Sequence, residues 1–108
     1  MGSPSDGLIR ELRRFRRKVT KRYPVRRMLL FGSRAGGKVH RFSDVDLIVV
    51  SEWFRGRNAV DRAFPLRLEW DLAYPVDFLC YTPEEFRLLA RRPSLVRQAL
   101  REGRTIPE

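Results

Sequence analysis

A glycine-serine pair followed by a pair of aspartates constrains the fold of this chain more than any other feature. Gly32-Ser33 directly follows four apolar residues, and ten residues later Asp44 and Asp46 stand where the next apolar run begins. Short apolar runs bounded by such residues predict buried strands. Because residues two apart in a strand point to the same face of a sheet, Asp44 and Asp46 should present two carboxylates together.

These two motifs together predict a site for a metal ion and a phosphate. Carboxylates held close together repel each other unless a cation lies between them, and their hard oxygens suit magnesium. A glycine turn lets backbone N–H groups and the Ser33 hydroxyl approach a phosphate closely. Asp44 alone could instead be a turn residue that enters a strand.

A third aspartate, Asp77, lies inside another strand-like run, between Val76 and Phe78. We expect it to be buried among these apolar neighbours, and an unpaired buried charge is costly. Asp77 is therefore predicted to have a cationic partner.

The pattern of Gly-Ser, ten residues, Asp-x-Asp and a later aspartate resembles the DNA polymerase β-like nucleotidyltransferase superfamily. Within it, the chain is similar to the minimal nucleotidyltransferases over roughly residues 8 to 90. The resemblance implies an α/β (α+β) fold, in which a small mixed sheet is flanked by helices. One position departs from the family, because Gly36 stands where members often carry a second arginine.

The resemblance also implies an activity and its residues. Asp44, Asp46 and Asp77 would be catalytic and would hold two Mg²⁺ ions, while Gly32, Ser33 and Arg34 would bind the nucleotide. The substrate would be ATP or another nucleoside triphosphate. Its nucleoside monophosphate would pass to an acceptor hydroxyl.

The acceptor is implied by the resemblance alone. Minimal nucleotidyltransferases are commonly paired with an all-helical HEPN-domain protein in toxin–antitoxin systems, where they add AMP to a tyrosine of the toxin. Two alternatives stay open: a non-catalytic subunit that neutralises its partner by covering it, and a stand-alone enzyme that acts on small molecules.

The formal net charge of +10 is concentrated near the N-terminus. Residues 6–22 are predicted to form a helix, with Leu8, Leu12, Phe15 and Val19 as its single apolar stripe. Arg13, Arg14, Arg16, Arg17 and Lys18 give its other faces a dense positive charge. That surface would attract a polyanion or an acidic protein, or it is simply a solvated face.

Composition predicts one domain, residues 6–108, after a flexible tail of residues 1–5. The single cysteine, Cys80, excludes an internal disulfide and suits a core position in a protein of the cytoplasm. His40, the only histidine, is expected to contact solvent, with contact to the substrate as the alternative. We find no transmembrane run or signal-peptide core, and we predict no membrane partner.

The remaining periodicity predicts the order of the elements. Strands are expected at residues 26–31, 45–51 and 76–81, and a loop at 53–56. Helices are expected at 58–73, with a break near Pro65, from the N-cap Thr82 to before Pro93, and at 94–102. The predicted shared faces are Phe64, Leu68 and Leu72 in the first of these helices, and Leu95, Gln98, Ala99 and Glu102 in the last.

Overall fold

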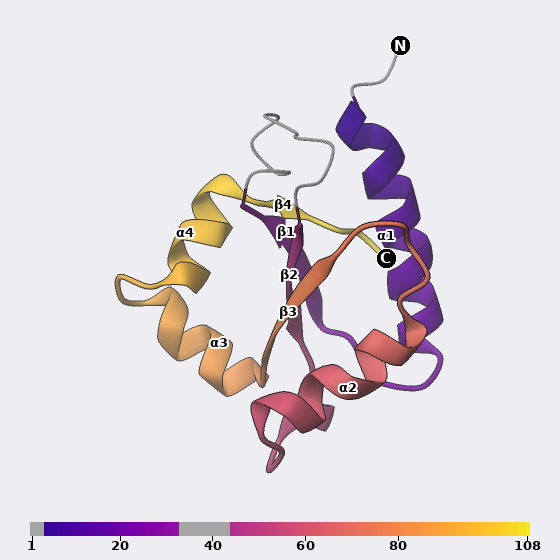
Figure 1. The fold of residues 1–108 in the computed structure, drawn as a ribbon. Helices are drawn as coiled ribbons and strands as arrows, with labels where there is room; N and C mark the ends of the chain where they lie inside the picture. Colours follow the sequence, from indigo (N-terminus) through magenta and orange to yellow (C-terminus); the bar gives the residue numbers. More distant parts are fainter. Residues whose placement is uncertain (1–3, 33–43) are drawn as a thin grey trace.

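The computed structural model describes residues 4–32 and 44–108 of the chain, which form a four-stranded sheet between two layers of helices (Figure 1). In chain order the elements are α1 (Pro4–Thr20), β1 (Arg27–Phe31), β2 (Val45–Val50), a 3₁₀ helix (Glu52–Phe54), α2 (Ala59–Glu69), β3 (Val76–Tyr81), α3 (Pro83–Ala90), α4 (Leu95–Glu102) and β4 (Arg104–Thr105). None of the described helices is long and apolar enough to cross a membrane.

The sheet is mixed, as expected, with strand order β3-β2-β1-β4. β2 pairs in parallel with β3, whereas β1 runs antiparallel to both β2 and β4. The two-residue strand β4 was not expected, because two residues are too few to show a period. It pairs Leu29 with Thr105 and brings the C-terminal segment onto the sheet beside α1 (Figure 1).

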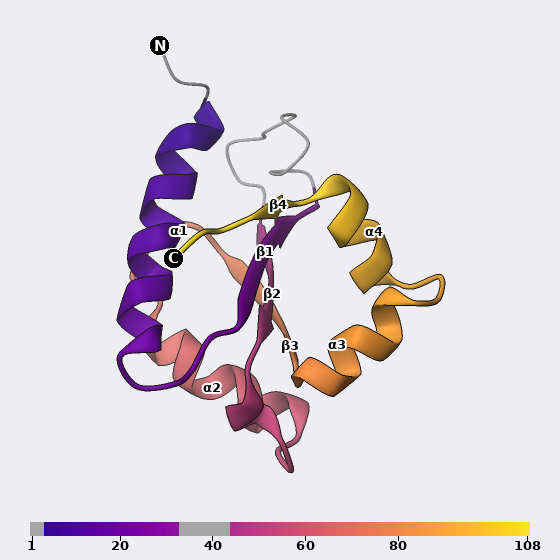
Figure 2. The same cartoon turned by 180° about the vertical axis from the view of Figure 1, so that it is seen from behind.

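Each face of the sheet is covered by a different pair of helices. α1 and α2 lie on one side, and α3 and α4 on the other (Figures 1 and 2). Alternate residues of β1 serve the two layers: Met28 and Leu30 belong to the core beneath α1, and Leu29 to the smaller core beneath α3 and α4. This alternation follows from the period of two along a strand.

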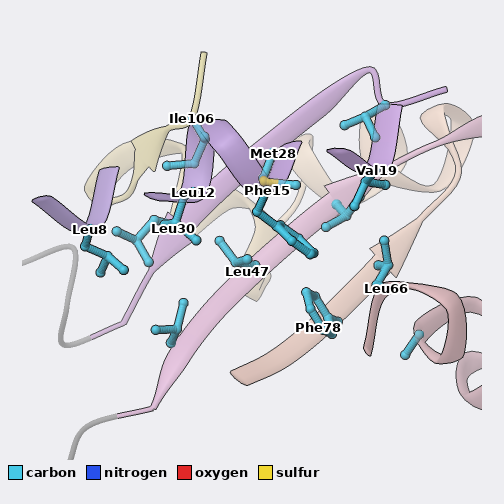
Figure 3. Packing of buried hydrophobic residues seen from close by; sticks show 14 of the residues in the cluster. Leu8, Leu12, Phe15, Val19, Met28, Leu30, Leu47, Leu66, Phe78 and Ile106 are labelled. Carbon is cyan, nitrogen blue, oxygen red and sulfur yellow. The ribbon is translucent and has the colours of Figure 1, made fainter. Parts of the chain in front are cut away.

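The apolar stripe predicted for the first helix is confirmed. Leu8, Leu12, Phe15 and Val19 are all buried in the larger core, where they face Leu30, Leu47 and Phe78 from the sheet (Figure 3). The expectation for Arg16 is wrong, because this residue is buried and does not belong to the exposed basic face.

Two further expectations about helix faces are wrong. In α2, Phe64 and Leu68 are exposed, while Ala63 and Leu66 pack into the core. In α4, Leu95 is exposed, and the residue after it, Val96, is buried beside Ala99. Short helices carry few apolar residues. Two sets of residues one position apart can therefore look equally like the apolar face of the helix.

Local signals for helix ends performed better than the face assignments. The predicted capping box is present, with the Thr82 side chain accepting from the Glu85 N–H and the Glu85 side chain accepting from the Thr82 N–H. The break expected near Pro65 is wrong, because α2 continues through this residue. The expected loop at 53–56 overlaps the 3₁₀ helix, whose Phe54 is buried in the core.

Candidate active site

The turn after β1 is shaped by Gly32. Its φ of +79° lies in the left-handed region that L-residues with a side chain rarely adopt. A Cβ built at this position would lie 2.5 Å from Oδ2 of Asp46. Glycine is therefore favoured by the backbone conformation at position 32, and a Cβ there would also force the Asp46 carboxylate to shift.

Two of the three predicted aspartates face each other across neighbouring strands. In the parallel ladder between β2 and β3, Asp46 is the partner of Asp77, and on the other side of β2 it pairs with Phe31 of β1. Asp44 lies two residues before Asp46, just ahead of β2. Because Val45 belongs to the core beneath α1, the pleat directs Asp44 and Asp46 toward the opposite face of the sheet.

The three carboxylates differ in their exposure to solvent. Asp46 is half-buried, whereas Asp44 and Asp77 are exposed. The expectation that Asp77 is a buried charge is wrong, because β3 is the edge strand of the sheet and its first residues are open to solvent. Its place in the site therefore rests on its register with Asp46.

The charges of Asp44 and Asp77 act on Asp46. Burial raises the pKa of Asp46, and the negative charges of Asp77 and Asp44 raise this pKa further. Each effect disfavours the ionised form, so that a nearby cation would relieve the repulsion and lower the pKa again.

The donor set suits a hard divalent cation, although the side chains do not form a closed coordination shell. Across residues 4–32 and 44–108, no three His, Cys, Asp or Glu side chains are arranged to hold a metal ion. The fit is one of chemistry, because three carboxylates supply hard oxygen donors at the ends of two adjacent strands. Ser33, Arg34, Gly36 and His40 lie outside the described residues.

Cys80 takes no part in this site. It follows Asp77 by three residues in β3, and burial raises the pKa of its thiol to about 12. A thiol with that pKa remains protonated at neutral pH, as expected for a packing residue.

Sequence patterns did not indicate that α4 borders the site. A pocket of about 420 Å³ lies beside Gly32 and is lined on the α4 side by Leu95, Gln98 and Glu102. The Gln98 amide donates to the Glu102 carboxylate at 3.1 Å. These residues belong to no recognisable motif, because only the folding of α4 against β1 brings them to the turn.

The nucleotidyltransferase domain family matches residues 12–106, a span that includes the described ends of β1, β2 and β3. The chain belongs to this family. The predicted resemblance to minimal nucleotidyltransferases and the predicted fold are confirmed.

A Haemophilus influenzae relative named "Probable protein adenylyltransferase MntA" is 40% identical over 73 residues, which cover 63% of this chain. The chain spans 61% of the length of that curated relative. The crystal structure of a candidate nucleotidyltransferase from Sulfolobus solfataricus superimposes with a TM-score of 0.64 at 21% identity. The superposition covers 78% of this chain and 75% of the S. solfataricus chain, and it supports the fold alone.

Proposed function

We propose that this nucleotidyltransferase transfers AMP from ATP to a tyrosine hydroxyl of a HEPN-domain partner and thereby acts as an antitoxin in the cytoplasm. The observation that carries the proposal is the register of Asp46 with Asp77 beside the Gly32 turn. A second support is the name of the H. influenzae relative, which describes a protein adenylyltransferase.

Asp44, Asp46 and Asp77 are the residues that would hold Mg²⁺, two ions in the proposed arrangement. When bound, the metal supplies a lowered pKa for the attacking hydroxyl and stabilises the charge on the leaving pyrophosphate. The chain itself contributes the placement of the carboxylates: Asp46 and Asp77 are fixed by the ladder between β2 and β3.

The Gly32 turn binds the triphosphate. Without a side chain, its backbone can approach phosphate oxygens closely, and Ser33 and Arg34 add a hydroxyl and a guanidinium to the same segment. In the reaction, the acceptor oxygen bonds to the α-phosphorus as the α–β bond to pyrophosphate breaks. The hydroxyl proton passes to solvent.

The test is transfer of label from ATP to the native partner. The chain is purified with its partner and incubated with magnesium and ATP labelled at the α-phosphate. We expect label on a partner tyrosine, none with the Asp46→Asn variant, and none when that tyrosine is changed to phenylalanine. A complex of the chain with its partner that forms but leaves the label on ATP would overturn the proposal.

The same experiment separates the two alternatives. If the chain is a non-catalytic subunit, the Asp46→Asn variant should silence the partner as well as the parent chain does, and silencing should not need ATP. A stand-alone enzyme would label small alcohols in the absence of any partner. The observation that opposes the non-catalytic alternative is that Asp46 lies beside two further carboxylates at one end of the sheet, where their charges disfavour its ionised form.

A further inference from the structure

A second pocket lies at the end of the sheet opposite the aspartates. Its volume is about 480 Å³, and it is rimmed by Arg26, Arg27, Arg87 and Arg91 over a floor that includes Val50 and Phe86. Val50 pairs with Arg27 at this end of β1 and β2, whereas Asp46 lies four residues earlier in β2. At about 3.3 Å per residue, the two ends are roughly 13 Å apart along the strand.

The arginines of this pocket carry more positive charge than the nearby carboxylates neutralise. Arg26 pairs with Glu52 at 3.3 Å, and Arg87 approaches Glu84 at 4.0 Å. Glu84 also accepts a hydrogen bond from Arg55 at 2.9 Å, so that its charge is shared. These surface pairs are weak because water and salt screen them.

Neither Arg27 nor Arg91 forms an ion pair within the described part of the chain. Arg91 caps the C-terminus of α3, where the helix dipole favours a cation. The cap is made by the backbone N–H of Arg91, so that the guanidinium donors of this residue stay available at the rim of the pocket.

Phe86 holds the guanidinium of Arg27 over the floor of the pocket. The centre of the guanidinium lies 5.1 Å from the ring centroid, within the range of a cation–π contact. Phe86 itself is buried. A guanidinium held over a ring keeps N–H donors at its edge, where they match two oxygens of one phosphate.

We propose that this arginine-rimmed pocket binds a ligand with two or more phosphate groups, at a site separate from the candidate active site. Its volume is in the range of small-ligand sites, about 300–1,000 Å³, which favours a free nucleotide over a nucleic-acid backbone. A second copy of the chain is a poor occupant, because each copy carries a net charge of +10.

The two sites differ in their need for metal, and this difference makes the proposal testable. The aspartate site repels phosphates unless a divalent cation is present, whereas the arginine pocket needs none. Binding of sodium tripolyphosphate to the full chain is therefore measured by calorimetry in EDTA. We expect one site per chain and affinity that falls with salt.

The variants separate a built site from general attraction to a basic protein. Arg27→Gln with Arg91→Gln should weaken tripolyphosphate binding about tenfold or more, because two charge-assisted contacts are lost. The matched control is Arg10→Gln with Arg17→Gln, which removes the same charge from exposed positions of α1 and should change affinity less than about twofold. Equal losses in the two double variants would overturn the proposal.

Arg27→Lys provides a test that keeps the charge. A lysine ammonium cannot form the planar, two-pronged contact, so binding should weaken although the net charge is unchanged. Affinity equal to that of the parent would contradict the role given to the stacked guanidinium. All variants are first compared by thermal unfolding, where exposed arginines should have little effect.

Competition identifies the source of the phosphates. In EDTA, ATP should displace tripolyphosphate from the parent chain and lose this ability with Arg27→Gln and Arg91→Gln. A single-stranded octanucleotide that competes more strongly than ATP would support phosphate recognition but assign it to a nucleic-acid backbone. The absence of tripolyphosphate binding to the parent chain in EDTA would overturn the proposal outright.

Discussion

At the residue scale, the candidate site depends on a glycine and a carboxylate that share one small space. Gly32 has a positive φ, and its missing Cβ leaves room for the Asp46 side chain. Asp46 in turn has a raised pKa because it is partly buried and lies near two like charges. Substitution of each of these two residues should therefore have a measurable effect of its own.

Gly32→Ala should destabilise the fold and lower nucleotide transfer. The left-handed backbone costs about 1–2 kcal/mol with a side chain, and the clash with Asp46 adds to it. Gly56→Ala is the matched control, since its φ is +76° and a Cβ there meets no atom within 4 Å. Urea unfolding of both variants measures the difference. Equal losses of stability would show that the contact with Asp46 does not matter.

Asp46→Asn should raise the stability of the metal-free protein at neutral pH and abolish transfer. An aspartate whose folded pKa is raised binds more protons in the folded state, so its contribution to the free energy of unfolding falls as pH rises through the window between the unfolded and folded pKa. Unfolding is measured in EDTA from pH 3 to 7. The free energy of unfolding of the variant should rise relative to that of the parent as pH increases, and the difference should then reach a plateau.

Magnesium provides the companion measurement for Asp46. Added Mg²⁺ should stabilise the parent and have less effect on Asp46→Asn, because a ligand that binds the folded state shifts the unfolding equilibrium. If Mg²⁺ stabilises the parent and the variant equally, Asp46 is not a ligand of the metal.

At the scale of elements, Arg16 joins α1 to the C-terminal segment. Its guanidinium donates to the carbonyls of Ile106 at 2.6 Å and Val25 at 3.3 Å, and it lies 3.7 Å from a carboxylate oxygen of Glu108. Burial lowers the pKa of Arg16, and Glu108 opposes this shift. The guanidinium thus takes the place of water for the carbonyl of Ile106, which follows β4, and for the carbonyl of Val25, which precedes β1.

Arg16→Ala should destabilise the protein by about 2–4 kcal/mol, because it leaves buried carbonyls unpaired and removes packed volume. Arg17→Ala is the control on the next residue, which is exposed, and should cost less than about 0.5 kcal/mol. Chemical unfolding at one pH compares them. A small effect for Arg16→Ala would mean that water satisfies these carbonyls equally well.

At the scale of the whole molecule, the excess of positive charge is only partly balanced. Glu69 and Asp71 neutralise part of the basic face of α1 by pairing with Arg14 and Lys18, and Glu69 also pairs with Arg22 just after the helix. Arg10 and Arg17 are exposed and form no ion pair among the described residues. These two residues are the part of α1 that can attract an acidic partner.

Arg10→Glu with Arg17→Glu should slow association with the proposed HEPN-domain partner about tenfold at low salt, since steering depends on exposed charge. The rates should converge at high salt, where screening acts over only a few ångströms. Arg97→Glu with Arg101→Glu on α4 is the control of equal charge, and stopped-flow mixing across a salt series compares the three proteins. If the association rates of both double variants depend on salt concentration with the same slope, α1 is not part of the interface.

What the sequence alone determined about this protein follows from short-range physics. The strand ends that carry Gly32, Asp44, Asp46 and Asp77, the stripe of α1 and the capping box of α3 depend on spacing between near neighbours, and spacing is visible in a sequence. The family and its fold could be predicted for the same reason. The roles of the site residues remain predictions.

Only the tertiary structure decided which charges are buried and which apolar residues are not. Arg16 is enclosed because β4 returns the C-terminal segment to α1, Asp77 is exposed because β3 is an edge strand, and Phe64 is exposed because α2 packs through Leu66. The arginine-rimmed pocket likewise gathers residues from β1 and α3. Burial depends on contacts between distant segments, and periodicity within one segment carries no information about them.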